Sequence, residues 1–401
     1  MTTFAPSNES EVIAAVSWAA AETASLEIVG HGSKRAIGRP PQCEHTLDLR
    51  NLSGVSLYEP EELVLSAYAA TPLKEINLHL SRKGQRLAFE PMDYGPLLGQ
   101  PRGRGTIGGV LAANLSGPRR LSAGAARDHI LGVKAVSGRG EAFKSGGRVV
   151  KNVTGYDMSK LMAGSWGALA VVTELTFKVL PVAETETTLA IRGLLDEEAT
   201  AAMAQALGSS AEVSCAAHLP EGVAGQVAGG ALGADAATLL RLEGFPPSIA
   251  YRLDLLKRLL GKAGALQTVE GETSKAIWRD VRDCMPFADD TDRPVWRVSM
   301  SPSQAHRLTL ELRRNTPATS FYDWQGGLVW LRMEGGDPEA EAIRAMVRHF
   351  GGGHATLVRA SQAVRAATQV FEPQPPALAE LSKRLKAEFD PHGVLNPGRM
   401  D

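Results

Sequence analysis

Glycines gathered between residues 102 and 181 constrain this chain more than any other feature of its sequence. Three blocks carry them: RGRGTIGGVLAAN from Arg102 to Asn114, KNVTGYD from Lys151 to Asp157, and GSWGALAVVTE from Gly164 to Glu174. A glycine has no Cβ, so the backbone at these positions can come close to a flat or anionic group. The stretch therefore predicts a binding site for a large, partly apolar cofactor.

The composition is that of an ordinary globular protein and excludes several classes of function. The 401 residues are 44% hydrophobic and 22% charged, and this length favours two domains or one large one. A formal net charge of −1 lacks the positive excess that nucleic-acid backbones require of their partners. The sequence starts without a signal-peptide pattern and contains no run of about 18 apolar residues. We therefore expect a cytoplasmic protein that binds no nucleic acid and reaches a membrane only through a partner.

The three cysteines, Cys43, Cys215 and Cys284, are scattered singly along the chain. Without a paired spacing they predict neither a disulfide framework nor an iron–sulfur or zinc centre. This pattern is typical of a protein from a reducing compartment.

An apolar strand predicted at 26–29 leads directly into the turn GHGSK, from Gly30 to Lys34. Consecutive backbone N–H groups, the Ser33 hydroxyl and the lysine cation are the donors that a pyrophosphate needs. Each hydrogen bond to a charged group contributes about 1.5–3 kcal/mol, so several are needed to offset desolvation of the anion. Taken alone, the loop also fits a surface turn between two strands.

Gly103, Gly105 and Gly108 match the pattern GxGxxG, and Asp128 lies about 20 residues further on, where a dinucleotide-binding fold places its ribose-binding acid. That motif must directly follow a buried strand. Residues 93–101, DYGPLLGQP, are broken by proline and glycine and cannot form one. We therefore reject a nicotinamide dinucleotide site here.

Hydrophobic periodicity predicts an α+β fold. Asn8 followed by Glu11 predicts a capped helix start, and the apolar run 168–180, ended by Pro181, predicts a buried strand. Beyond it, strands and helices alternate without glycine fingerprints, which favours an antiparallel sheet with helices on one face. The other predicted strands are 46–49, 55–58, 63–67, 86–90, 130–136, 141–143, 187–192, 212–218, 238–242, 295–300 and 328–333, and the other predicted helices are 72–82, 196–207, 248–260, 273–283, 303–314, 338–350 and 377–389.

Several motifs together resemble the FAD-binding domain of the vanillyl-alcohol-oxidase and p-cresol-methylhydroxylase (PCMH) type. Within that type, the sequences of these motifs are similar to those of the FAD-binding E subunits of bacterial glycolate oxidase, also called glycolate dehydrogenase. The resemblance implies a two-part PCMH-type FAD-binding domain at 1–181, an α+β cap domain with a mainly antiparallel sheet at 182–376, and a C-terminal helix with a return segment toward the FAD domain at 377–401. The motifs that carry it are Gly30 to Gly38, Thr106 to Asp128, Lys151 to Pro181, GPRR at Gly117–Arg120, VKNVTGYD at Val150–Asp157 and NPGRM at Asn396–Met400.

The resemblance also implies which residues contact the cofactor: the first loop at the FAD pyrophosphate, and the later blocks at the flavin, adenine and ribose. In some relatives the residue directly before the loop serine is a histidine attached covalently to the flavin. Here Gly32 precedes Ser33 and His31 lies one place away, so we expect non-covalent FAD. The implied cofactor residues are Gly30, His31, Gly32, Ser33, Lys34, Thr106, Gly108, Gly109, Asn114, Arg127, Asp128, Asn152, Tyr156, Asp157, Gly164, Val171 and Val172.

Oxidation of a 2-hydroxy acid by a flavin needs a cation for the carboxylate and a base for the hydroxyl proton. The forked guanidinium of arginine matches a carboxylate, and Arg297, Arg332 and Arg359 lie on predicted cap strands. The alternative for each is an ordinary strand arginine in a surface ion pair. His354 is the candidate base, with a structural or solvent-facing role as its alternative. The catalytic candidates are therefore His354, Arg297 and Arg332.

Relatives that oxidise D-lactate or glycolate carry a histidine- and acid-rich metal-binding motif in the cap. His349 and His354, five residues apart across three glycines, do not reproduce it. No other group of His, Cys, Asp and Glu has ligand spacing, so we expect no metal site.

The resemblance implies a larger FAD-binding glycolate oxidase subunit and an iron–sulfur subunit as partners. It also implies that the chain reaches a peripheral position at the inner membrane through this complex. Three hypotheses follow. The first is an FAD-binding subunit of a glycolate (or D-lactate) dehydrogenase complex, which oxidises glycolate to glyoxylate and passes electrons to its partners. The second is a non-catalytic assembly subunit with structural FAD or none, which flavin content distinguishes from the first. The third is a self-sufficient FAD oxidoreductase for another 2-hydroxy acid or alcohol, which flavin reduction by the isolated chain would favour.

Overall fold

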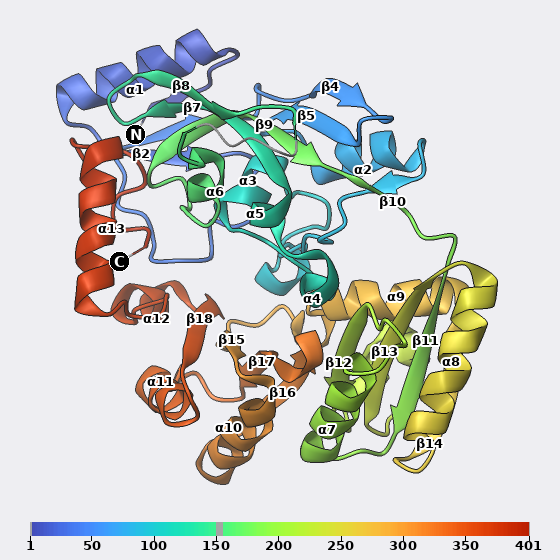
Figure 1. Cartoon of the computed structure of the whole chain (residues 1–401). Coiled ribbons are helices and arrows are strands. Elements are labelled where there is room, and N and C mark those ends of the chain that lie inside the picture. The colour runs from blue at the N-terminus through green and yellow to red at the C-terminus, as the bar shows by residue number, and fades with distance from the viewer. Residues whose placement is uncertain (1, 150–154, 401) are drawn as a thin grey trace.

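Two antiparallel sheets organise the chain, one in each half of the sequence (Figure 1). The computed structural model describes residues 2–149 and 155–400. Burial alternates along the central strand of the first sheet, β9, so one face of that sheet packs on the core. The five strands lie in the order β4 (Val55–Glu59), β5 (Val64–Tyr68), β9 (Ala170–Lys178), β7 (Ile130–Ser137) and β8 (Ala142–Gly146).

A small parallel sheet adds β1 (Thr2–Phe4), β3 (His45–Asp48) and β2 (Leu26–Val29) to the N-terminal half. Helix α1 (Glu9–Glu22) packs beside this sheet through apolar side chains that include Val12 and Val16. The predicted capped helix start is confirmed, because the Asn8 side chain accepts the Glu11 N–H at 3.0 Å.

Short helices connect the strands of this half. Helix α3 begins after Thr106, whose hydroxyl accepts the Gly109 N–H at 3.3 Å. The segment before Gly103 contains a 3₁₀ turn at Pro96–Leu98 and no strand, as its proline and glycine content predicts. The helices are α2 (Leu73–Ser81), α3 (Ile107–Ala112), α4 (Arg120–Ala123), α5 (Ala126–His129) and α6 (Met158–Met162).

The C-terminal half contains an eight-stranded sheet in which every strand pair is antiparallel. Helices α7 (Asp196–Leu207), α8 (Pro246–Leu260), α10 (Pro302–Asn315) and α11 (Ala340–His349) pack on one face, which we call the outer face. The strands lie in the order β14 (Ala265–Glu270), β11 (Thr185–Arg192), β13 (Ala237–Gly244), β12 (Cys215–Leu219), β16 (Ala318–Asp323), β17 (Leu328–Met333), β15 (Val295–Met300) and β18 (Gly353–Arg359).

One helix departs from the expected one-sided arrangement. Helix α9 (Gly271–Arg282) lies on the opposite face of this sheet, the inner face, where the Trp278 Nε1 donates to the Thr188 hydroxyl at 2.8 Å. Its buried Ile277 and Val281 belong to the same apolar cluster as residues of the N-terminal half. The inner face is therefore covered by α9 and by the N-terminal half together.

The end of the chain returns to the N-terminal half, where Figure 1 shows α13 (Pro376–Phe389) in red beside that half. Leu395 forms a parallel bridge with Leu26 of β2. The Lys386 ammonium donates to the Ala168 carbonyl at 2.6 Å and pairs with Asp390. Residues at opposite ends of the sequence thus meet at β2.

The sequence-based secondary structure was wrong in a few places. The predicted strand 86–90 is only a two-residue strand, β6 (Gln85–Arg86), because its single partner is the short β10 (Leu180–Pro181). Strands β14 and β16 were not predicted, since exposed or glycine-flanked segments give a weak alternation signal. Arg359 was expected on a strand and lies at the end of β18.

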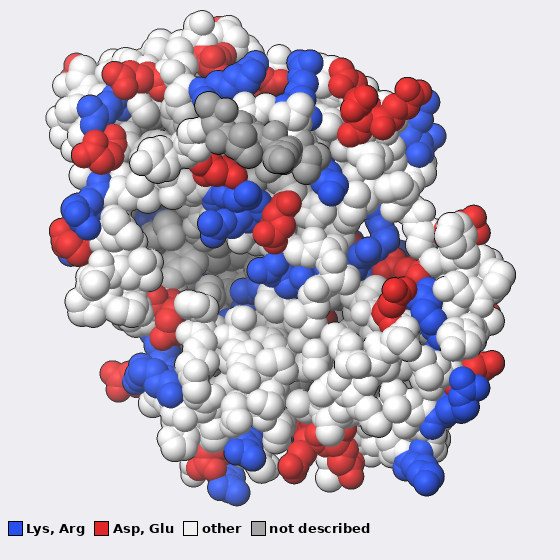
Figure 2. Space-filling view, in the orientation of Figure 1, with Lys and Arg blue, Asp and Glu red and all other residues white. Residues whose placement is uncertain are grey.

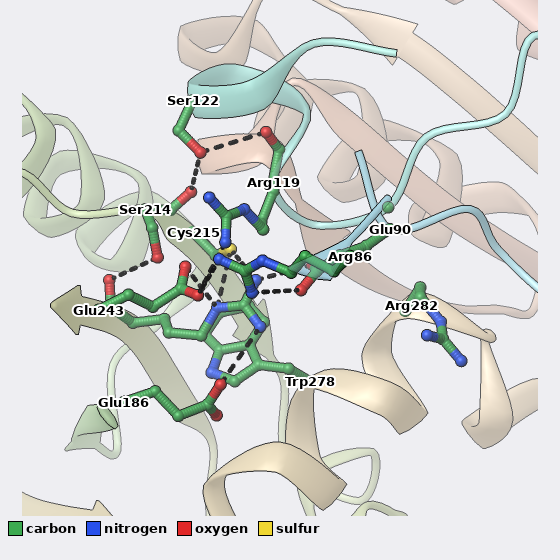
Figure 3. Close-up of polar contacts among 12 residues, drawn as sticks. Arg86, Glu90, Arg119, Ser122, Glu186, Ser214, Cys215, Glu243, Trp278 and Arg282 are labelled. Atoms are coloured by element: carbon green, nitrogen blue, oxygen red, sulfur yellow. Dashed lines mark hydrogen bonds and ion pairs between the residues drawn. The ribbon is translucent and has the colours of Figure 1, made fainter. Parts of the chain in front are cut away.

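A network of buried charges joins the two halves (Figure 3). Glu243 of β13 accepts from Arg86 at 2.8 Å and from Arg119 at 2.8 Å, and both arginines belong to the N-terminal half. In the opposite direction, Arg241 of β13 donates to Glu90 at 2.7 Å. Each half therefore supplies cations and carboxylates to the other.

Arg241 is the most buried member of this network, with 3% of its surface exposed. Its guanidinium lies 5.1 Å from the centre of the Trp278 ring and donates to the Cys215 sulfur at 2.8 Å. Burial alone would lower the pKa of Arg241, but Cys215, Glu90 and Glu243 raise it well above its usual value. The arginine is charged at every physiological pH, and its carboxylate partners are needed to compensate it.

We expect Glu243→Gln to destabilise the protein by about 3–5 kcal/mol, because it leaves buried arginines without their shared carboxylate. The measurement is the free energy of unfolding in urea. Glu212→Gln is the matched control, since Glu212 is exposed and lies 3.7 Å from Arg252, and it should cost about 1 kcal/mol or less. Equal losses in the two variants would show that this network does not hold the halves together.

Candidate functional site

Three hollows share Trp166 as a lining residue, and together we call them the cavity. Figure 2 shows a hollow between the two parts of the molecule with basic side chains on its border. We name the sections after one lining residue each: the Gly30 section, the Ala69 section and the Arg297 section. The first two are lined by the N-terminal half and the C-terminal return segment, and the Arg297 section lies between the two halves.

Glycines bring backbone close to the Gly30 section. Gly32 has φ +71°, a conformation that side chains disfavour, and a Cβ on Gly30 would lie 3.1 Å from the Thr106 hydroxyl. A Cβ on Gly109 would lie 3.2 Å from the Lys34 ammonium nitrogen. Gly108 serves a different purpose, because a Cβ there would lie 2.7 Å from the Ala69 carbonyl oxygen. The first three positions shape the cavity, and Gly108 allows α3 to pack on β5.

Lys34 carries a charge into the Gly30 section without a counter-ion. Among the described residues its ammonium contacts only the Ser33 hydroxyl, at 3.4 Å, and no carboxylate lies within 4 Å. Burial lowers the pKa of Lys34 to about 8. Arg399, which lines the same section, donates to the Lys34 carbonyl at 2.7 Å, and burial lowers its pKa to about 10. This arrangement suits an anionic ligand.

Three non-glycine residues with positive φ meet at the cavity: Asn114 (46°), Trp166 (51°) and Asn396 (44°). The Asn396 amide donates to the Trp166 carbonyl at 2.8 Å and accepts the Ile28 N–H at 2.8 Å. The Asn114 side chain accepts the Arg127 N–H at 3.0 Å. Strained backbone of this kind persists where surrounding structure enforces it, and it concentrates at functional sites.

Side chains of the inner sheet face line the Arg297 section. Arg297 on β15 is paired in register with Trp330 on β17, so both project from the same face, and Asp323 on β16 joins them. The Arg297 guanidinium lies 4.9 Å from the centre of the Trp324 ring. Burial lowers the pKa of Arg297, and within 2–149 and 155–400 no acceptor lies within hydrogen-bonding distance of it. This section therefore also contains a cation ready for an anion.

The other predicted catalytic residues lie outside the cavity lining. Arg332 pairs with Glu334 at 2.9 Å and with Asp289 at 3.2 Å. Arg359 is buried, donates to the Phe287 carbonyl and pairs with Asp289 at 2.9 Å. His354 lies at the exposed start of β18. Of the three arginines considered, only Arg297 combines a free guanidinium with a place in the cavity.

The structure places the predicted cofactor residues in two groups. Gly164, with φ +85°, lies next to Asn114 at the cavity's edge. Asn152 lies outside the described residues. Among the cavity-lining predictions are Gly30, His31, Gly32, Ser33, Lys34, Thr106, Gly108, Gly109, Asn114 and Val172.

The remaining cofactor predictions have other surroundings. Asp128 accepts the Ala125 N–H and pairs with Arg120, and the neighbouring Arg127 is exposed. Asp157 caps α6, Tyr156 is 91% exposed, and Val171 is buried in the apolar cluster around α1. Their assignment to the cofactor stays a prediction.

Sequence reasoning missed several lining residues. Asp323 lies in ATSFYD, a short strand that was not predicted because Pro317 and Gly326 interrupt the pattern on either side. The available signal was the aromatic-rich run from Phe321 to Trp324. Trp166 was not singled out from the glycine-rich segment around it. Its place in the cavity depends partly on Asn396, which lies far away in the sequence and donates to the Trp166 carbonyl.

Comparisons with known proteins show the family to which this chain belongs. The family of FAD binding domains matches residues 2–146, and the family of FAD linked oxidases, C-terminal domain, matches residues 364–400. The chain is 34% identical over 386 residues to the glycolate oxidase subunit GlcE of Escherichia coli (strain K12), covering 96% of this chain and 95% of that protein. The chain belongs to the GlcE family of FAD-linked oxidoreductases.

Two further similarities agree with this family. The glycolate oxidase subunit GlcD of Bacillus subtilis (strain 168) is 42% identical over 84 residues, which are 21% of this chain and 18% of that protein. The structure of p-cresol methylhydroxylase with substrate bound superimposes with a TM-score of 0.74 at 14% identity, covering 99% of this chain and 88% of that one. The GlcE-family chain thus has the PCMH-type fold that the sequence predicted.

The cavity fits FAD, the cofactor of this family. Lys34 and the glycine loop around it offer a cation and backbone donors to a pyrophosphate. The Ala69 section is lined by small and apolar residues such as Ala70 and Ala112, which suit a flat aromatic ring.

Two features are absent from residues 2–149 and 155–400. No group of three or more His, Cys, Asp or Glu side chains is placed to hold a metal ion there. No helix in this part of the chain is long and apolar enough to cross a bilayer.

We expect Gly109→Val to abolish FAD retention, because its side chain would displace the Lys34 ammonium from the Gly30 section. The measurement is flavin released per chain after purification and denaturation. Gly147→Val is the control, since a Cβ there has no neighbour within 4 Å. Normal flavin content in Gly109→Val would place the cofactor elsewhere.

We expect FAD affinity to fall as pH rises through about 8, because Lys34 loses its proton and therefore its attraction for the pyrophosphate. Titration of the apoprotein with FAD between pH 6 and 9.5 measures this dependence. Lys34→Met should bind FAD about 10- to 100-fold more weakly at pH 7, and its affinity should not decline near pH 8. Lys34→Arg should bind FAD across the whole range, because arginine keeps its charge at pH 9.5. An unchanged pH profile in Lys34→Met would contradict the assignment.

Proposed function

We propose that this chain is the FAD-binding subunit of a glycolate oxidase complex. In this proposal the complex oxidises a small 2-hydroxy acid, glycolate to glyoxylate or D-lactate to its oxo acid, and electrons pass from this chain to partner subunits. The similarity to GlcE over nearly the whole length of both proteins supports the subunit identity. The unpaired cations at the cavity support an anionic cofactor and an anionic substrate.

The position of Arg297 is the main support for the proposed class of substrate. Arg297 lines the section between the halves, it is partly buried, and no described residue neutralises it. A guanidinium without a partner at such a site costs stability unless a ligand compensates it. The carboxylate of a 2-hydroxy acid matches the guanidinium fork with two parallel hydrogen bonds.

In this proposal, different residues of the chain bind the cofactor, orient the substrate and exclude water. Lys34 and the Gly30 loop would hold the pyrophosphate, and Arg297 would orient the substrate carboxylate in the Arg297 section. Bound FAD supplies a two-electron acceptor. Trp324, Trp330 and Trp166 would exclude water from the reacting groups, since aromatic side chains wall that section or stack on its arginine.

The proposed partners are a larger FAD-binding subunit and an iron–sulfur subunit. The 84-residue similarity to GlcD supports a common origin of this chain and a GlcD-type subunit. In this proposal the chain is cytoplasmic and reaches the inner membrane only as part of the complex. Affinity purification of the tagged chain from its native cell, with identification of co-purified chains and cofactors, tests the assembly.

We expect Arg297→Met to raise the glycolate KM of the native complex about 10- to 100-fold, because one charge-assisted carboxylate contact is lost, while flavin content stays normal. Arg297→Lys should restore part of the affinity. Arg307→Met, an exposed arginine on α10, is the matched control. An unchanged KM in Arg297→Met would show that substrate is oxidised elsewhere in the complex, which is the assembly-subunit alternative.

A further inference from the structure

One buried carboxyl group differs from all the others in the described part of the chain. The fully described buried acids are Glu27, Asp48, Asp283, Asp323 and Asp390. Four of them form an ion pair with an arginine or lysine. Asp323, which is 2% exposed, has no such partner among residues 2–149 and 155–400. A carboxyl group buried without a cation is costly and calls for a reason.

A strained turn holds this carboxyl group in place. Trp324 (φ 52°), Gln325 (φ 62°) and Gly326 (φ 93°) follow Asp323 in succession, and two of the three are not glycine. One Asp323 oxygen accepts the Trp324 N–H at 2.7 Å. The Trp324 indole donates to the Gly117 carbonyl of the N-terminal half at 2.9 Å, which fixes the turn across the interface. No described residue donates to the second Asp323 oxygen.

The sheet register directs Asp323 and Arg297 into the same section. Arg297 pairs with Trp330, Trp330 pairs with Phe321, and Asp323 follows Phe321 by two residues, so its side chain projects from the same face. Both Asp323 and Arg297 line the Arg297 section. Trp324 contacts both residues. Its backbone N–H donates to the Asp323 carboxylate, and its ring lies 4.9 Å from the Arg297 guanidinium.

The surrounding charges leave the Asp323 carboxyl able to titrate near neutral pH. Burial raises its pKa to about 7 against the opposing effect of the Trp324 N–H. Arg241 of β13 and Arg297 of β15 favour the ionised form, and Glu90 of the N-terminal half disfavours it. Tyr94 and Arg282 complete the ionisable lining of the section. Proton acceptors work best with a pKa near the working pH.

We propose that Asp323 is the proton acceptor for a 2-hydroxy acid bound in the Arg297 section. The inference rests on the proposed function and adds the residue that completes it. Arg297 holds the carboxylate, and the free Asp323 oxygen accepts a hydrogen bond from the hydroxyl group. His354, the candidate base from the sequence, lies outside this section.

The step balances with bound FAD as the oxidant. The substrate O–H bond breaks and its proton moves to the Asp323 carboxylate. The Cα–H bond would break with its electron pair, and bound FAD would supply the two-electron acceptor for that pair and its hydrogen. The carbon–oxygen single bond becomes a carbonyl, so the product is a 2-oxo acid and the protonated Asp323 later returns its proton to solvent.

Replacement of Asp323 tests the proposal in the native complex with only this chain altered. In wild type, the rate of flavin reduction by glycolate should rise with pH through about 7, because the ionised carboxylate is the active form. Asp323→Asn keeps the size and the acceptor for Trp324 and should slow reduction about 100-fold or more, with that pH dependence lost. Asp323→Glu should recover part of the rate, and the exposed Asp254→Asn on α8 is the matched control.

Oxalate binding to the FAD-loaded chain gives a readout that does not depend on turnover. The bound anion should raise the pKa of Asp323, so calorimetry in two buffers near pH 8 should show proton uptake in wild type and none in Asp323→Asn, with affinity changed only a few-fold.

The outcomes separate the two claims. Wild-type rate and pH profile in Asp323→Asn, or loss of the pH dependence in Tyr94→Phe instead, would overturn the role of Asp323 and leave the proposed function standing. A slow Asp323→Asn with an unchanged pH profile and unchanged proton uptake would reduce Asp323 to a structural residue, which also overturns the proposal. A wild-type complex that no 2-hydroxy acid reduces would overturn the proposed function, and this inference with it.

Discussion

The buried charge network around Arg241 and Glu243 links one half of the chain to the other, and the Arg297 section of the cavity lies between these two halves. Arg86 and Arg119 reach from the N-terminal half to Glu243, and Arg241 reaches back to Glu90. Buried ion pairs contribute little net free energy but penalise any displacement that separates the partners. The network therefore helps to fix the position of the inner sheet face relative to the N-terminal half.

Charged side chains without a partner lie at the cavity, which is where we propose that the cofactor and the substrate bind. Along the interface every buried arginine has a carboxylate or carbonyl partner, yet Lys34 and Arg297 face the cavity without an anion among the described residues. Asp323 is their acidic counterpart, a buried carboxyl group without a cation. Evolution tolerates such groups where a ligand completes them. FAD is the cofactor of the family to which the chain belongs, and a substrate carboxylate is the ligand that we propose for Arg297.

The sequence revealed local features and could not reveal pairings. The loop from Gly30 to Lys34 and the cap at Asn8 depend on neighbouring residues, so their patterns were readable. The three candidate arginines looked alike in sequence, because the pattern of a strand does not show which side chains lie around each residue. Arg297 and Arg332 project from the same sheet face, yet Arg297 lines the cavity and Arg332 pairs with Glu334 and Asp289. The importance of Asp323 could not be predicted, because its strand is short and because the neighbouring Trp324 is held by Gly117 and Arg297, which are distant in the chain.

An experimental structure of the chain with FAD and oxalate bound would test the central claim most directly, since that claim concerns where the two ligands lie. We expect the pyrophosphate beside Lys34, the flavin ring reaching the Arg297 section past Trp166, and an oxalate carboxylate on the Arg297 guanidinium with its other end toward Asp323. Flavin outside the three sections, or oxalate bound without contact to Arg297, would contradict the account.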